Sequence, residues 1–296
     1  MSLSMRIIFF SLIGIIAGVL AWPFAETVVF FQAQFPSILL FSIVLGVVIG
    51  ILMGGCVGTS EGIMAHSWSK VRSGILAGIL IGAIGGLVGF VIGQAALLLI
   101  GTKFFNSTHS FRNIGFPLSK AIGWAAFGMF VGMGEGIRSR SGDKVKHGII
   151  GGLIGGFIGG FLFEYLRIRI ESHYLGRLAG LAVLGLLIGL FYGIIENKLS
   201  RAKLIILNGK NRGKEFPLAQ RVMKIGSSKN AEIGIEGYRG VAEEHAEIKR
   251  EKKSFTVVDG GSRYGTYVND QKISQTKLQP DSVIRIGNVQ FLFTVQ

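Results

Sequence analysis

The chain has 296 residues, of which 49% are hydrophobic and 16% charged, and its mean hydropathy is +0.53. Because a soluble protein usually carries roughly a quarter charged residues, this composition excludes an ordinary soluble protein and places much of the chain in lipid. The net charge of +14 does not indicate a nucleic-acid partner, because many basic residues lie between apolar runs, where they orient membrane proteins. The single cysteine, Cys56, excludes an intrachain disulfide and a cysteine metal cluster.

The polarity of the chain changes near Ser200. Residues 1–202 contain 7 of the 17 acidic residues, and the other 10 lie in residues 203–296. We therefore predict two domains, a glycine-rich transmembrane domain over residues 1–200 and a soluble domain over residues 203–296.

Six apolar runs in the first domain are long enough to form a bundle of transmembrane helices. Crossing the hydrocarbon core takes about 20 apolar residues. The first run also has features of a secretory signal peptide, but no small-x-small cleavage site follows Trp22, so we expect this helix to be retained. The predicted spans are approximately 5–21, 38–58, 73–100, 119–136, 147–166 and 176–195.

The basic residues between the runs indicate an orientation. If the N-terminus is inside, ten Lys and Arg residues flank the spans on that side and six flank them on the other. Short cytoplasmic loops accumulate Lys and Arg. We therefore predict a multi-pass protein whose C-terminal domain is cytoplasmic.

A repeat with an offset of 74 residues runs through the apolar region. The segment Gly-Thr-Ser-Glu-Gly-Ile at 58–63 corresponds to Gly-Met-Gly-Glu-Gly-Ile at 132–137, and a series of glycines follows each. A weaker third copy at 185–194 has Tyr192 in place of the glutamate. Each full copy contains two spans, so both copies are expected to insert in the same direction. The corresponding glycines are Gly74, Gly78, Gly82, Gly85 and Gly86 in the first copy and Gly148, Gly152, Gly156, Gly159 and Gly160 in the second.

Many of these glycines recur every four residues and therefore line one face of a helix. Lipid supplies little hydrophobic drive between helices, so small residues that allow close backbone approach are a principal means of packing. We interpret these faces as a glycine zipper, within one chain or between the chains of a homo-oligomer. The alternative interpretation is a pore or pathway lined by the same faces.

Glu61 and Glu135 are the acidic residues that the repeat places at the membrane edge. A carboxylate near lipid is costly enough to be a functional hypothesis by default. One hypothesis is an intramembrane ion or proton site. The other is a structural role, in which the carboxylates pair with basic residues of the nearby loops or with helix ends.

From Lys203 onward, short alternating or β-branched stretches are separated by turn signals such as Asn208-Gly209 and Asp259-Gly260-Gly261. This pattern predicts an all-β sandwich. The candidate strands are Lys203–Leu207, Met223–Ile225, Ala246–Lys249, Phe255–Asp259, Tyr267–Val268, Val283–Ile286 and Gln290–Val295.

Three motifs of this segment resemble those of the forkhead-associated (FHA) domain family and occur in the family's order. Ile225-Gly226-Ser227 is similar to the family's Gly-Arg segment, and residues 241–248 are similar to its Ser-x-x-His segment, with His245 as the histidine. Residues 259–269 are similar to its Asp-x-x-Ser-x-Asn-Gly-Thr-x-Val-Asn segment. The resemblance covers residues 203–296 and implies a β-sandwich that binds phosphothreonine peptides through loops at one end. Together with the multispan region, it implies a protein of a bacterial inner membrane.

Most positions that hold the phosphate in the family carry other residues here. Ser227 replaces the phosphate-binding arginine and Ala242 replaces the serine. Glu243 replaces a basic residue, and Tyr264 replaces the asparagine that grips the peptide. Phosphate recognition relies on charge-assisted hydrogen bonds from such donors. We therefore prefer phosphorylation-independent protein binding over altered phosphopeptide binding or a purely structural module. The predicted partner-binding residues are Ser227, Ser228, Lys229, Asn230, Arg239, Arg263 and Tyr264.

The sequence contains no motif of an enzyme. Its five histidines, His66, His109, His147, His173 and His245, are scattered, and no nucleophile elbow, phosphate loop or zinc-protease motif occurs. We predict no catalytic residue, no cofactor and no metal.

Two functions remain open. The first is a membrane-anchored scaffold or receptor that recruits a cytoplasmic or membrane protein through the FHA-like domain, with the lipid bilayer as its anchor and no nucleic-acid partner. The alternative is a transporter or channel whose bundle conducts a solute under regulation by the FHA-like domain. The repeat and the two glutamates favour the alternative, whereas the scarcity of ionisable residues in the spans favours the scaffold.

Overall fold

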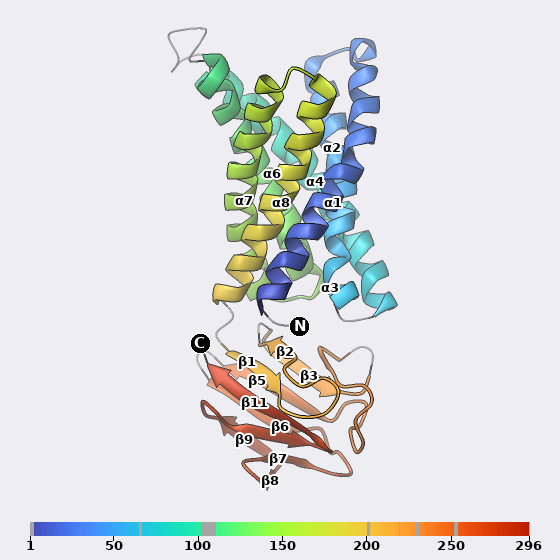
Figure 1. Ribbon diagram of the computed structural model, residues 1–296, viewed down its shortest axis with the longest axis vertical. Helices are drawn as coiled ribbons and strands as arrows, with labels where there is room; N and C mark the ends of the chain where they lie inside the picture. The colour runs from blue at the N-terminus through green and yellow to red at the C-terminus, as the bar shows by residue number, and fades with distance from the viewer. Residues whose placement is uncertain are drawn as a thin grey trace. The chain divides into compact units, whose positions relative to one another are not determined.

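The computed structural model of the protein describes residues 3–64, 67–101, 111–199, 202–218, 220–228, 231–251 and 254–295. These residues form two compact units, one of helices over Arg6–Glu196 and one that contains the β-strands from Asn197 onward (Figure 1).

Six helices in the described part of the chain are long and apolar enough to cross a membrane. They confirm the predicted class of the first unit. Two helices begin at serine caps, because Ser37 Oγ accepts a hydrogen bond from the Leu40 amide (3.1 Å) and Ser141 Oγ accepts one from the Lys144 amide (3.4 Å). The long helices are α1 Leu3–Phe30, α2 Ile38–Gly58, α4 Trp68–Ala96, α6 Phe116–Arg138, α7 Gly142–Arg169 and α8 His173–Leu199, with a short α3 at Ser60–Met64 and π-helical turns at Leu97–Gly101 and Phe111–Gly115.

Helix α1 is longer than the apolar run that predicted it. The predicted span stops at residue 21, before Trp22-Pro23, yet the helix continues to Phe30. Proline removes one backbone donor from a helix interior. The surrounding apolar sequence keeps the other backbone groups paired inside the helix, and Thr27 Oγ1 donates a hydrogen bond to the Pro23 carbonyl (2.9 Å).

Glycines bring neighbouring helices into backbone contact. A Cβ added to Gly54 or Gly58 on α2 would collide with the carbonyl oxygen of Gly78 or Gly74 on α4. Any larger residue at these positions would force the helices apart. The same two contacts recur between α6 and α7, 74 residues further along the chain. There Gly128 contacts Gly152 and Gly132 contacts Gly148.

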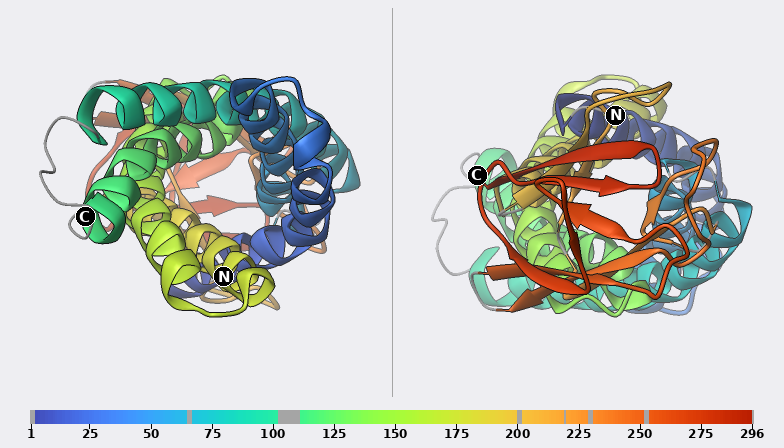
Figure 2. Two further views of the ribbon diagram at one scale, coloured as in Figure 1. Left: turned by 90° about the horizontal axis from the view of Figure 1, so that it is seen from above. Right: turned by 90° about the horizontal axis from the view of Figure 1, so that it is seen from below.

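The long helices surround a common axis when the bundle is viewed along its length (Figure 2). Helices α1 and α8 meet through Gly14 and Gly185, although they come from opposite ends of the helical region. Large apolar side chains, among them Met53, Phe127 and Leu184, are fully buried in the bundle. The middle of the bundle is therefore packed as a core.

The second unit is a β-sandwich of two sheets, as predicted. One sheet has the strand order β2-β1-β11-β10-β7-β8 and the other β4-β3-β5-β6-β9. Leu204 pairs with Phe293 and Ile206 with Phe291 across β1 and β11, and all four side chains are buried. The strands are β1 Ala202–Ile206, β2 Glu215–Pro217, β3 Val222–Gly226, β4 Ile233–Gly234, β5 Ala246–Glu251, β6 Ser254–Asp259, β7 Thr266–Val268, β8 Gln271–Ile273, β9 Gln275–Leu278, β10 Val283–Ile286 and β11 Val289–Val295.

Four short strands, β2, β4, β8 and β9, were not predicted. Each has between two and four residues, which is too short to establish an alternating pattern. The hairpin that joins β7 to β8 turns at Asn269 and Asp270, whose φ angles are 49° and 63°. Positive φ at both positions is typical of a two-residue type I′ turn, which asparagine and aspartate tolerate.

Candidate functional site

Three loops of the β-unit meet at one end of the sandwich. The Ser227 amide donates a hydrogen bond to the Ala242 carbonyl (3.0 Å), so the segment after β3 is joined to the segment before β5. The third loop, residues 260–265, joins β6 to β7. Gly240 lies next to it, because a Cβ added to Gly240 would be 3.5 Å from the Tyr264 ring. We call this surface the loop face and define it by Ser227, Ser228, Arg239, Arg263 and Tyr264.

His245 is fully buried and links two of these loops. Its Nδ1 accepts a hydrogen bond from the Ala242 amide (3.0 Å), so the proton is assigned to Nε2, which donates to the Gly265 carbonyl (3.2 Å). Gly265 has a φ of +70°, a conformation that glycine adopts without strain. The imidazole therefore positions the loops and is not available to a substrate.

The Asp259 carboxylate holds the third loop. Its Oδ2 accepts hydrogen bonds from the amides of Gly261 (3.0 Å) and Ser262 (3.2 Å), and its Oδ1 accepts from the hydroxyls of Ser262 (2.8 Å) and Thr266 (2.6 Å). Burial by itself would raise the pKa of Asp259. The hydrogen bonds from Thr266, Ser262 and Gly261 outweigh it and hold the pKa below its ordinary value.

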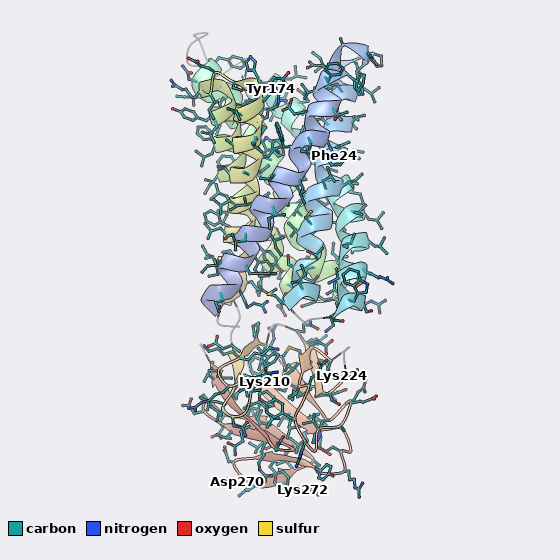
Figure 3. All side chains as sticks on the ribbon, turned by 45° about the vertical axis from the view of Figure 1, so that its right-hand side comes forward. Phe24, Tyr174, Lys210, Lys224, Asp270 and Lys272 are labelled. Atoms are coloured by element: carbon teal, nitrogen blue, oxygen red, sulfur yellow. The ribbon has the colours of Figure 1, made fainter. Side chains whose placement is uncertain are left out.

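Acidic side chains flank the loop face. Glu243 and Glu244 are both exposed. Lys224 Nζ lies 2.8 Å from Glu244 Oε1, and this hydrogen bond raises the pKa of Lys224, which lies at the surface of the β-unit (Figure 3). No described cation lies within 4.0 Å of Glu243. A phosphate bound beside this carboxylate would meet like-charge repulsion.

Five of the seven predicted partner-binding residues lie on the loop face, and the other two, Lys229 and Asn230, lie outside the described residues. Tyr264 is 59% exposed, and Arg239 and Arg263 are exposed as well. Tyrosine and arginine are enriched among the residues that dominate protein–protein binding energy. The chemistry of the loop face is thus suited to a protein surface, and the role of these residues stays a prediction.

The two glutamates of the repeat meet at one lysine of the bundle. Lys144 Nζ lies 3.3 Å from Glu61 Oε1 and 4.0 Å from Glu135 Oε1. Arg138 also donates to Glu135 through Nη2 (2.6 Å) and Nε (2.8 Å). The structure thus brings Glu61 and Glu135 together in one group of charges.

Arg6 and Glu196 complete this group and, like Arg138 and Lys144, they were not predicted as site residues. Arg6 Nη2 lies 3.2 Å from Glu61 Oε1 and 3.1 Å from Glu196 Oε1. Both residues have a signal in the sequence. Arg6 is a charge in the first turn of the apolar run 5–21, and Glu196 is a charge directly after the run 176–195. The charge network therefore consists of three cations and three carboxylates, namely Arg6, Glu61, Glu135, Arg138, Lys144 and Glu196.

The charge network is balanced and closely packed. The cavity beside Glu61 and Glu135 has a volume of about 20 Å³, which is room for a single water molecule. Buried charges persist when they are paired and hydrogen-bonded. The ion pairs of Glu61 and Glu135 agree with the structural role of these residues. The ion or proton site remains a hypothesis.

Residues 205–296 match the family described as inner membrane component of T3SS, cytoplasmic domain. Over 92 residues, the chain is 33% identical to the glycogen accumulation regulator GarA of Mycobacterium tuberculosis, a match that covers 31% of this chain and 56% of GarA. It is also 33% identical over 92 residues to the oxoglutarate dehydrogenase inhibitor of Corynebacterium jeikeium, covering 31% of this chain and 63% of that protein. The chain therefore spans little more than half the length of these curated relatives.

Solved structures of FHA domains are similar to the same segment. The FHA domain of the CT664 protein from Chlamydia trachomatis is 31% identical and covers 33% of this chain and 99% of its own, with a TM-score of 0.31. The FhaA FHA domain, solved in complex with the intracellular domain of Rv3910, is 25% identical and covers 31% of this chain and 98% of its own, with a TM-score of 0.29.

The ordered motifs, the two-sheet sandwich and the sequence relatives identify the C-terminal segment as a forkhead-associated domain. This confirms the resemblance seen in the sequence. The protein thus combines six long apolar helices with an FHA domain.

Proposed function

We propose that this protein is a membrane-anchored scaffold whose FHA domain recruits a partner protein at the cytoplasmic face of an inner membrane. The observation that carries the proposal is a complete FHA fold, with loops held by His245 and Asp259, attached to a chain with six apolar helices. An interaction fold on a membrane anchor restricts its partner to the membrane surface. We propose the domain boundaries 1–200 and 203–296 for the anchor and the binding module.

The comparisons support recruitment of a protein. The FhaA FHA domain forms a complex with the intracellular domain of another protein, and the matched family is a cytoplasmic domain of an inner membrane component. By analogy, the partner of this FHA domain is a cytoplasmic protein or the cytoplasmic part of a membrane protein. The analogy concerns the domain alone, because function resides in the site.

We further propose that partner binding does not require phosphothreonine. Ser227 and Tyr264 stand where the family has its phosphate-binding arginine and its asparagine, and Glu243 adds a negative charge that no described cation approaches within 4.0 Å. The cations among the described residues of the loop face, Arg239 and Arg263, suit the carboxylates of a folded partner. Altered phosphopeptide binding is the competing outcome.

The test is a pull-down of the full-length tagged protein from native membranes, with and without phosphatase treatment of the lysate. We expect a discrete partner that survives phosphatase and is lost in the variant Arg239→Ser/Arg263→Ser/Tyr264→Ser. The control variant, Arg212→Ser/Arg221→Ser, removes two exposed arginines elsewhere on the domain and should retain the partner. A partner that is lost on phosphatase treatment would contradict phosphorylation-independent binding.

A second candidate function is a transporter or channel formed by the bundle. It is favoured by the 74-residue repeat and by the convergence of Glu61 and Glu135 on Lys144. Ion flux in proteoliposomes that disappears in Glu61→Gln/Glu135→Gln would support this function. The same flux in wild type and variant would exclude these carboxylates from the path, and absence of flux in the wild type would favour the scaffold.

A further inference from the structure

All six long helices contribute residues to an open cavity at the end of the bundle opposite the charge network. Its volume is about 420 Å³, within the usual range of small-molecule sites. The wall is mostly apolar and includes the aromatic residues Phe41, Phe90, Phe116, Trp124 and Phe163. We call this cavity the chamber. On α1, α6, α7 and α8 the residues that line it lie at least eleven positions from the network residue of the same helix, so the two features are separate.

Cations and a single carboxylate line the chamber. The cations are Lys120, Arg167 and Arg177, and the carboxylate is Glu164. Arg167 Nη2 lies 2.8 Å from Glu164 Oε2, and Arg177 is held by two hydrogen bonds from Nε and Nη2 to Glu26 (2.5 and 2.6 Å). In the described part of the chain, no carboxylate lies within 4.0 Å of Lys120 Nζ. One positive charge at the chamber wall is therefore left without a close counter-charge.

The positive charge is concentrated around one aromatic ring. Lys120 Nζ is 6.0 Å from the centroid of the Phe116 ring, and Arg167 Cζ is 5.5 Å from it. Phe116 itself lines the chamber. Two cations that share one ring repel each other, and an anion placed between them would relieve that repulsion.

The repeat provides an internal comparison for these charges. At the offset of 74, Lys120 corresponds to Gly46 and Glu164 to Phe90. In the first copy these positions pack against each other, since a Cβ on Gly46 would be 2.6 Å from the Phe90 ring. The helix pair thus packs without charges at these positions. Lys120 and Glu164 are an addition to the framework, and ionisable groups inside membrane spans are usually retained for function.

We propose that the chamber binds a small aromatic or apolar anion, with a carboxylate or phosphate head. Lys120 and Arg167 bind the head, because ammonium and guanidinium groups form charge-assisted hydrogen bonds with both kinds of oxyanion. The rings of Phe90, Trp124 and Phe163 contact the apolar body. This site is independent of the FHA domain and of its partner.

The position of Trp124 in the wall makes binding measurable. The chain has three tryptophans, so the full-length variant Trp22→Phe/Trp68→Phe in zwitterionic lipid nanodiscs leaves Trp124 as the only indole reporter. The probe is 4-bromobenzoate, whose bromine quenches tryptophan fluorescence on contact. The parallel probes are 4-bromophenyl phosphate, for the other head group, and 4-bromobenzylammonium, for the opposite charge.

We expect saturable quenching by at least one of the two anions and none that saturates with the cation. Saturation by the phosphate alone would assign the head group as phosphate, and saturation by benzoate alone would assign it as carboxylate. Lys120→Gln should weaken binding by about tenfold or more, and Lys120→Arg should restore it. The matched control is Lys146→Gln, an exposed lysine at the opposite end of the bundle, which should leave the Kd unchanged.

Linear, unsaturable quenching with equal slopes for all three probes would mean partition into the bilayer only and would overturn the proposal. Tighter binding of the cation would overturn it as well. If Lys120→Gln does not fold, unlabelled benzoate and phenyl phosphate must displace the brominated anion from the Trp124 reporter protein. Failure of both competitors would also count against the site.

Discussion

Lys144 illustrates what single buried charges do in this protein. Its side chain is 9% exposed and has Glu61 and Glu135 within 4.0 Å. A buried ion pair adds little net stability over an apolar substitute, but removal of one partner leaves an uncompensated charge and costs about 3–5 kcal/mol. The network therefore stabilises the bundle only when all six charged residues are present.

Replacement of Lys144 by methionine leaves two cations for three buried carboxylates and should destabilise the helical unit by several kcal/mol, on the order of the cost of one uncompensated buried charge. The matched control, Lys146→Met, removes an exposed lysine from the same helix and should change stability by less than about 0.5 kcal/mol. Unfolding of the full-length protein in detergent, followed by tryptophan fluorescence, measures both. Equal stability of the two variants would show that the network is not needed for folding.

Asp259 should make the third loop sensitive to acid. Because its folded pKa is lowered, its contribution to stability is complete above the ordinary aspartate pKa of about 3.9 and is lost as the pH falls through the lower folded value. Asp259→Asn should therefore increase hydrogen exchange of the amides at 261–266 at pH 7. The difference from wild type should shrink below about pH 4. A difference that stays constant down to pH 2 would contradict this account.

At the scale of elements, helix packing depends on the absence of side chains at defined contacts. Gly78 on α4 approaches Gly54 on α2 so closely that a methyl group has no space, whereas a Cβ on Gly142 would meet nothing within 4 Å. Neither glycine is required by a positive φ. The two positions therefore differ in the space around them and not in backbone conformation.

Gly78→Leu should separate α2 from α4 and reduce stability by more than about 2 kcal/mol, because overpacking forces backbone shifts. Gly142→Ala should be neutral or slightly stabilising, since alanine is the better helix former. Thermal aggregation of the purified protein in detergent compares the two. A Gly78→Leu variant as stable as wild type would show that the α2–α4 contact is not close in the membrane.

The elements could be predicted where a long periodic pattern exists. The six apolar helices follow from hydropathy, and the seven predicted strands correspond to β1, β3, β5, β6, β7, β10 and β11. The continuation of α1 through Pro23 was not predicted, because a proline that ends a helix in water is tolerated in an apolar run. The short strands β2, β4, β8 and β9 depend on their neighbours in the sheet and carry no pattern of their own.

At the scale of the whole molecule, the loop face, the charge network and the chamber differed in how far they could be predicted. The loop face was predicted because the FHA motifs mark the loops in sequence order, with His245 and Asp259 as fixed points. The charge network and the chamber unite residues that lie up to 190 positions apart, such as Arg6 and Glu196. Only the arrangement of all six helices brings such residues together, so the sequence predicted Glu61 and Glu135, which the repeat marks, but not the groups that they and the other residues form.

The central claim is that the loop face recruits a protein partner without reading phosphothreonine. Its most direct test is photo-crosslinking from position 264, with the exposed Tyr264 replaced by a photoreactive phenylalanine analogue in the full-length protein. Native membrane vesicles with cytosol are treated with phosphatase or left untreated before irradiation, and an analogue at exposed Arg221, elsewhere on the domain, serves as the control position. We predict one discrete adduct from position 264 that phosphatase does not reduce and that position 221 does not form. An adduct that disappears after phosphatase, or no adduct from position 264 at all, would contradict the claim.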